Sequence, residues 1–159
     1  ALLMPLLYMP RPLARRYRLG VIAHAYERGM DCIAPGELPD DVLDIDITGD
    51  IFDVIEQVAA CDEILSSSLH GLVCAEAYGI PSRWVALSDR PAGDGFKYHD
   101  FYSALGKQAG TPPPIESAAD WSRLAGTSKA PVVRDNLARI TQDLLTACPF
   151  TPQNRIGSR

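Results

Sequence analysis

The chain has 159 residues, of which 47% are apolar and 22% are charged, a balance expected of a globular domain with a hydrophobic core. Its formal net charge is −5, and because nucleic-acid binding requires a basic surface, the composition argues against a nucleic-acid partner. No apolar run approaches the length of a membrane span, so we expect no membrane-spanning segment.

The first residues differ in character from the rest. The segment 1–18 is rich in proline and arginine, as in "MPRPLARRYR". We expect it to be a connecting segment with its charges solvated, in preference to a partner-binding patch. The sequence begins without Met, so we expect it to start inside a longer protein.

Strands and helices are predicted to alternate along the middle of the chain. The predicted strands are 18–25, 41–47, 63–68 and 82–87, and the predicted helices between them are 51–61 and 69–79. Such alternation implies right-handed crossovers and an α/β fold, in which a parallel sheet is flanked by helices on both faces.

The helix ends carry local signals. Thr48 or Asp50 can cap the first helix, and Gly79 and Pro81 stop the second. A glycine-rich loop follows the last predicted strand, and a helix is expected to begin in "KYHDFYSAL". A clear amphipathic helix is predicted over 132–148.

The stretch "SSSLHGLVCAEAYGIP" places polar groups where a strand ends and a helix begins. Ligands of open parallel sheets bind at this edge, and a helix N-terminus offers free N–H groups and partial positive charge. Ser67, Ser68, His70 and the backbone of Leu69 therefore form a candidate anion site, with Gly71 allowing a ligand close to the backbone. For Ser68 alone, simple helix capping is the favoured interpretation; for His70, ligand contact is favoured.

Glu76 falls within the apolar face of the second helix, near its C-terminus. A buried carboxylate needs a donor. A structural bond to a backbone N–H or an arginine, and a contact with a ligand, are equally good interpretations.

The remaining histidines and the cysteines give no metal signal. His24 ends a strand and can face the same edge as His70, while His99 lies among aromatic residues. No two histidines have ligand spacing on one helix, and the four cysteines form no CxxC pair. We expect no metal, no resident cofactor and reduced thiols in a cytoplasmic protein.

At this point the residues resemble a known family. "ILSSSLHGLVCAEAYGIPSRWV" followed by "FKYHDFYSALG" is similar to the polysaccharide pyruvyl transferases, and "LGVIAHAYE" resembles a strand of that family that ends in proline–histidine–tyrosine. The resemblance covers residues 1–106 and is best at 63–106. Alanines stand on both sides of His24 in place of the proline and tyrosine, and Ser68 stands where some members have arginine.

The resemblance implies a Rossmann-like domain similar to the C-terminal half of a GT-B glycosyltransferase. It implies transfer of a pyruvyl group from phosphoenolpyruvate to a sugar of an exopolysaccharide or of its lipid-linked precursor, in the cytoplasm or at the inner membrane surface. The domain that binds the donor would span 19–148, with a loose tail over 149–159. A missing N-terminal domain would help to bind the acceptor, and the piece alone would be inactive.

Roles follow for the candidate residues if the resemblance holds. The Ser67–His70 turn would hold one acidic group of phosphoenolpyruvate, and Lys97 or Arg83 would neutralise the other. His70 is the first choice for the general acid and His24 the second, because histidine titrates near neutral pH. Equally, His70 could bind phosphate only, with the acid supplied by the missing half.

Two other functions remain open. The chain could be half of a GT-B glycosyltransferase that binds a nucleotide sugar, with Glu76 on the ribose. It could also be a non-catalytic sugar-binding domain that keeps the fold but binds no anion at the Ser67–His70 turn.

Overall fold

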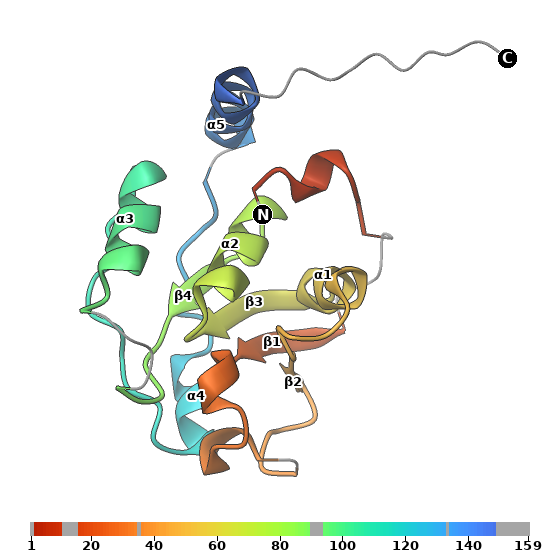
Figure 1. Ribbon diagram of the computed structural model, residues 1–159. Coiled ribbons are helices and arrows are strands. Elements are labelled where there is room, and N and C mark those ends of the chain that lie inside the picture. Colours follow the sequence, from red (N-terminus) through yellow and green to blue (C-terminus); the bar gives the residue numbers. More distant parts are fainter. Residues whose placement is uncertain (1, 11–15, 35, 90–93, 133, 149–159) are drawn as a thin grey trace, which may run out of the picture.

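The computed structural model describes residues 2–10, 16–34, 36–89, 94–132 and 134–148. Four parallel strands form one sheet in the order β2-β1-β3-β4 (Figure 1), which confirms the predicted α/β class. The strands are β1 (Tyr17–Ile22), β2 (Val42–Asp44), β3 (Cys61–Ser66) and β4 (Ser82–Trp84). The helices are α1 (Ile51–Ala59), α2 (Leu69–Ala77), α3 (Phe96–Ala104), α4 (Ala118–Leu124) and α5 (Arg134–Ala147), with short 3₁₀ helices η1 (Met4–Leu6), η2 (Ala25–Glu27) and η3 (Asp31–Ile33).

Helices cover both faces of the sheet, as the sequence predicts. Side chains alternate between the faces along each strand. Ile22 and Ile64 face α1 and α2, whereas Val21 and Leu65 face α4 and η3. Figure 1 shows α1 and α2 on one side of the sheet and α4 on the other. The chain therefore buries two apolar layers, and α3 adds a third cluster beside α2.

Each strand ends two or three residues earlier than predicted. The expected strand over 63–68 ends at Ser66, and the one over 82–87 ends at Trp84. The cause is that the chain leaves the ladder to turn at the carboxyl edge of the sheet. Ser67 and Ser68 thus fall in the turn between β3 and α2.

The local helix signals hold with one refinement. Asp50, and not Thr48, caps α1: its carboxylate accepts the backbone N–H of Phe52 at 2.9 Å and of Asp53 at 3.3 Å. Gly79 ends α2 with a φ of 71°, a conformation that glycine adopts without strain.

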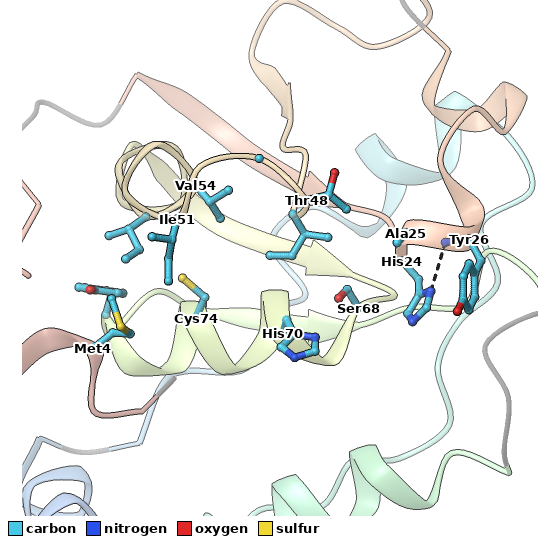
Figure 2. A pocket seen from close by; sticks show the side chains of 14 residues that line it. Met4, His24, Ala25, Tyr26, Thr48, Ile51, Val54, Ser68, His70 and Cys74 are labelled. Carbon is cyan, nitrogen blue, oxygen red and sulfur yellow. Dashed lines mark hydrogen bonds between the residues drawn. The ribbon is translucent and has the colours of Figure 1, made fainter.

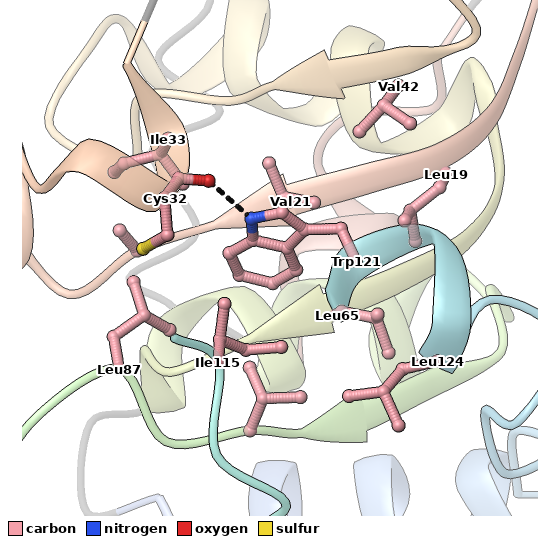
Figure 3. Packing of buried hydrophobic residues seen from close by; sticks show 12 residues of the cluster. Leu19, Val21, Cys32, Ile33, Val42, Leu65, Leu87, Ile115, Trp121 and Leu124 are labelled. Atoms are coloured by element: carbon pink, nitrogen blue, oxygen red, sulfur yellow. Dashed lines mark hydrogen bonds between the residues drawn. The ribbon is translucent and has the colours of Figure 1, made fainter. Parts of the chain in front are cut away.

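Helix α4 was not predicted, because seven residues are too short for a visible apolar period. It begins in a capping box, in which the side chain of Ser117 accepts the backbone N–H of Asp120 and the side chain of Asp120 accepts the backbone N–H of Ser117. Its Trp121 is fully buried, and the indole nitrogen donates to the Cys32 carbonyl at 2.7 Å (Figure 3). This contact fixes α4 and η3 to the same face of the sheet.

The capping box of α4 leads to a prediction about the stability of the protein at acid pH. The guanidinium of Arg123 and the N–H groups of Glu116 and Ser117 lower the pKa of Asp120 from 3.8 to about 2. Because the folded pKa is depressed, this stabilisation is present above the unfolded pKa and is lost as pH falls through the folded pKa. We expect carboxyl NMR to give Asp120 a midpoint near pH 2, and the variant Asp120→Asn to lose less stability than wild type between pH 4 and 2. A midpoint near the ordinary value would contradict the capping geometry.

The segment before β1 and helix α5 lie outside the buried apolar clusters. The segment before β1 contacts α1, because the Tyr8 hydroxyl donates to Glu56 at 2.5 Å and its ring lies 4.7 Å from Phe52. Helix α5 matches the predicted amphipathic helix, yet Leu144 and Leu145 are about 45% exposed. The predicted tail 149–159 lies outside the described residues. Among the described helices, none is long and apolar enough to cross a membrane.

Candidate active site

A cavity of about 480 Å³ opens at the carboxyl edge of the sheet, between η2, α1 and α2. Figure 2 shows that it is elongated: Met4 and Ile51 lie toward one end, and His24 lies at the other. We call it the histidine pocket. Its described lining contains no Asp, Glu, Lys or Arg; it consists of Met4, His24, Ala25, Tyr26, Ile47, Thr48, Gly49, Ile51, Val54, Ile55, Ser68, His70, Cys74 and Tyr78.

His70 stands in the first turn of α2 and is exposed to the pocket. Within the described residues, neither of its ring nitrogens has a protein partner, and the backbone N–H groups of Leu69 and His70 have no protein acceptor. These N–H groups are the free donors that a helix start leaves, and they carry the positive end of the helix dipole. The imidazole and the helix end therefore offer donors side by side.

His24 faces the same pocket from the end of β1 and is half-buried. Its Nδ1 accepts the backbone N–H of Tyr26 at 3.3 Å (Figure 2). An accepting nitrogen carries no hydrogen, so the neutral ring holds its hydrogen on Nε2. In its neutral form His24 thus presents Nε2–H as a donor, whereas His70 has both ring nitrogens without a partner among the described residues.

The three serines at the end of β3 make different contacts. The Ser66 hydroxyl accepts the Ser68 N–H at 3.0 Å and lies 3.0 Å from the Ile22 carbonyl, so it joins β1 to the turn. The Ser67 hydroxyl is committed within the protein: it accepts the His24 N–H at 2.9 Å and donates to Glu27 at 2.5 Å. Only Ser68 lines the histidine pocket, and its hydroxyl makes no capping bond, contrary to the favoured expectation.

Two predicted contacts of the turn are used for packing. A Cβ atom at Gly71 would lie 2.6 Å from the Ser66 hydroxyl and 3.0 Å from an Ile22 methyl group, so the close approach there is between α2 and the sheet, not to a ligand. The side chain of Leu69 packs against the cluster of Leu72, Tyr98 and Tyr102, which leaves only its backbone N–H for a ligand.

Glu76 lies outside the histidine pocket. Its carboxylate is 1% exposed and is held by the Lys107 ammonium, 2.8 Å from each oxygen, and by the Val132 backbone N–H. Of the two interpretations that the sequence left open, this is the structural one, with a lysine in place of the expected arginine. The bond joins α2 to the segments on either side of α4.

The predicted cations do not meet the histidines. Arg83 lines a separate cavity with Tyr102 and Lys129, and the Lys97 ammonium lies 5.1 Å from the centre of the Tyr98 ring. Neither lines the histidine pocket. In the described part of the chain, the groups of that pocket that can attract an anion are therefore the start of α2 and the two imidazoles.

Two features in and next to the histidine pocket are not indicated by the sequence as part of a site. Thr48 and Gly49, which precede α1, line the pocket opposite His70. Glu27 is fully buried behind His24, with its oxygens on the hydroxyls of Ser67 and Ser88. A lone glutamate in "HAYERG" gives no periodicity, so its burial could not be read from the sequence.

The thiol of Cys74 also lines this pocket. Burial raises the pKa of Cys74 to about 11, so its sulfur is a thiol at neutral pH and a poor nucleophile. In the part of the chain that the structure describes, no group of three or more His, Cys, Asp or Glu side chains could hold a metal ion. The arrangement instead suits binding of an anion and proton transfer by an imidazole.

Comparison with known proteins points to one family. A family profile described as "Polysaccharide pyruvyl transferase" matches residues 6–89. This range contains all four strands, both pocket histidines and Ser68. It stops before α3, so "FKYHDFYSALG", which the sequence analysis counted toward the resemblance, lies outside the match.

Two curated proteins also match part of this chain. "Uncharacterized protein L143" of Acanthamoeba polyphaga mimivirus is 34% identical over 100 residues, 61% of this chain and 34% of the viral protein. "Succinoglycan biosynthesis protein ExoV" of Rhizobium meliloti (strain 1021) is 34% identical over 62 residues, 39% of this chain and 19% of ExoV. This chain therefore spans about a third and about a fifth of the lengths of these relatives.

One solved structure was also found to be similar. It is the glycosyltransferase SnogD from Streptomyces nogalater, with a TM-score of 0.43 and 21% identity, covering 87% of this chain and 42% of SnogD.

Proposed function

Because the chain belongs to the polysaccharide pyruvyl transferase family, we propose that it binds phosphoenolpyruvate in the histidine pocket and takes part in pyruvyl transfer to a sugar. The acceptor that we propose is a sugar of an exopolysaccharide or of its lipid-linked precursor. The chain spans only part of its relatives, so residues beyond it are proposed to select the acceptor.

One observation carries the proposal. In a protein of net charge −5, the described lining of the histidine pocket contains no carboxylate, while free N–H groups and two imidazoles converge there. A site favours an anion when it has no carboxylates and offers hydrogen-bond donors. Phosphoenolpyruvate carries two acidic groups, and the N–H groups of Leu69 and His70 with the Ser68 hydroxyl can hold one of them.

The chemistry then requires a proton at a carbon atom. In this proposal His70 gives its proton to the methylene carbon of phosphoenolpyruvate, which leaves an electron-deficient carbon beside it. A sugar hydroxyl adds to that carbon and returns its proton to His70. Phosphate leaves with the electron pair of its C–O bond, and a second hydroxyl closes the ketal and gives its proton to the departing phosphate. His24, as a neutral donor, would orient the acidic group that the helix end does not hold.

Calorimetry on this chain tests the binding step. We expect phosphoenolpyruvate to bind with a dissociation constant in the millimolar range or tighter, because a helix end and an imidazole supply charge-assisted hydrogen bonds. Replacing Ser68 with alanine should weaken binding about tenfold, the loss of one such bond. Binding that Ser68→Ala leaves unchanged would move the anion away from this turn, and no binding at all would favour a non-catalytic domain.

A second candidate rests on the other end of the pocket. Met4, Ile51, Val54 and Ile55 line an apolar region that phosphoenolpyruvate, which has no large apolar group, does not need. A nucleotide sugar could place its base there and its diphosphate at the start of α2. The same calorimetry with a panel of nucleotide sugars separates the two candidates.

A further inference from the structure

We propose that Glu27 is a positioning residue of the histidine pocket: its buried carboxylate fixes His24 opposite His70 through the hydroxyl of Ser67. The effect on turnover rests on the proposed function, whereas the effect on His24 does not. Glu27 itself does not line the histidine pocket and acts only through other residues.

The burial of Glu27 is costly and specific. Its side chain is fully buried, and its oxygens lie 2.5 Å from the Ser67 hydroxyl and 2.6 Å from the Ser88 hydroxyl. No ion pair to Glu27 is formed within the described residues. A carboxylate buried against hydroxyls alone is an expensive way to fill space, so packing does not account for it.

The hydrogen bonds have a fixed direction. A serine hydroxyl has one hydrogen, and the carboxylate of Glu27, which only accepts when ionised, takes that of Ser67. The lone pairs of the Ser67 oxygen are thereby turned toward the backbone N–H of His24, at 2.9 Å. The chain of bonds from His24 through Ser67 to Glu27 thus has one possible polarity.

Glu27 also joins three strand ends. It follows β1, Ser67 follows β3 and Ser88 follows β4, so one carboxylate spans the carboxyl edge of the sheet. The Tyr98 hydroxyl donates to the Ser67 carbonyl at 2.6 Å from the other side. Burial raises the pKa of Tyr98 to about 12, so this donor stays protonated at neutral pH.

The pocket lies directly next to this junction. Ser68, which lines the pocket, follows Ser67, and His70 is two residues further along. Figure 2 shows His24 and His70 presented to one space from neighbouring strand ends. Moving Ser67 relative to His24 would therefore change the separation of the two imidazoles.

The test follows the His24 ring by NMR. Nitrogen-15 shifts of the imidazoles in the full-length protein distinguish the Nδ1–H and Nε2–H forms, with the signals assigned by His→Gln variants. Wild type should show His24 as the Nε2–H form alone, because its Nδ1 accepts the Tyr26 N–H. In Glu27→Ala we expect a mixture of both forms, and in Glu27→Gln we expect the wild-type signal, because an amide can accept from Ser67 and donate to Ser88.

The control is a second buried carboxylate. Glu63, 7% exposed, accepts the backbone N–H of Gly126 and lies away from the histidine pocket. Glu63→Ala should lower the melting temperature yet leave the His24 signal unchanged. A wild-type His24 signal in folded Glu27→Ala would overturn the proposal, as would the same disturbance in Glu63→Ala. If Glu27→Ala does not fold, Ser67→Ala removes the same bridge with a smaller change and decides the question.

Turnover provides a separate measurement. We expect kcat/KM for pyruvyl transfer to fall at least about tenfold in Glu27→Ala and to recover to within about threefold in Glu27→Gln. A wild-type protein without pyruvyl transfer would refute the proposed function, while the His24 signal would still decide the role of Glu27.

Discussion

Replacing His70 with alanine in the full-length protein is expected to lower kcat for pyruvyl transfer by at least about a hundredfold, the loss typical of a missing acid–base group. The reason is that His70 is the one pocket imidazole whose ring nitrogens have no partner within the described residues, so it can gain and give a proton without breaking a protein contact. The assay is phosphate release from phosphoenolpyruvate that depends on the acceptor sugar.

Binding and catalysis by His70 can be told apart. If His70 is the general acid, the dissociation constant for phosphoenolpyruvate should change far less than kcat. If it only binds phosphate, the dissociation constant should rise instead. The matched control is His99→Ala. The centre of the His99 ring lies 5.8 Å from that of Trp84, and His99 does not line the histidine pocket. Near-normal turnover of the His70 variant would remove it from the mechanism.

The sequence predicts the sheet well because its strands and helices carry repeated local signals. Short apolar runs mark β1 and β3, alternating apolar and acidic residues mark β2, and Asp50 and Gly79 mark helix ends with groups that act within a few residues. The same locality explains the correct placement of His70. Its position, directly after a strand and in the first turn of a helix, depends on neighbours in the sequence and on the geometry common to parallel sheets.

The rest of the site depends on contacts between distant residues. Glu27 is bonded to Ser67 and Ser88, which lie 40 and 61 residues away. No sequence pattern near Glu27 indicates these contacts. The sequence offers Lys97 or Arg83 as the cation that neutralises the second acidic group of the donor, but neither lines the histidine pocket. Strand β4 has only three residues, too few to show from the sequence which way a side chain faces, and Arg83 lines another cavity.

The sequence indicates that the Glu76 carboxylate needs a partner but does not identify that partner. Its place on an apolar helix face shows that the carboxylate needs a partner, but the partner is 31 residues away in a segment without regular structure. That partner, Lys107, also donates to the Ala130 carbonyl at 2.8 Å. One ammonium group therefore neutralises a buried charge and fixes the segment that leads to α5.

We expect Lys107→Met to lower the free energy of unfolding by about 3–5 kcal/mol, because it leaves Glu76 as a buried charge with one backbone N–H. Chemical denaturation measures this loss directly, and the melting temperature should fall by roughly 10 °C. The matched control is Arg18→Met. Arg18 pairs with Asp41 at 2.6 Å, but both side chains are at least 41% exposed, so its loss should cost no more than about 1 kcal/mol.

A double variant separates the buried charge from the pair itself. If the large cost of Lys107→Met comes from an uncompensated carboxylate, removing that carboxylate as well should restore most of the stability. We expect Glu76→Leu combined with Lys107→Met to unfold within about 1–2 kcal/mol of wild type, even though the same ion pair is absent. A double variant as unstable as Lys107→Met alone would show that the lysine acts through its bond to Ala130 and its packing, and a single variant that loses less than about 1 kcal/mol would show that water reaches Glu76 in solution.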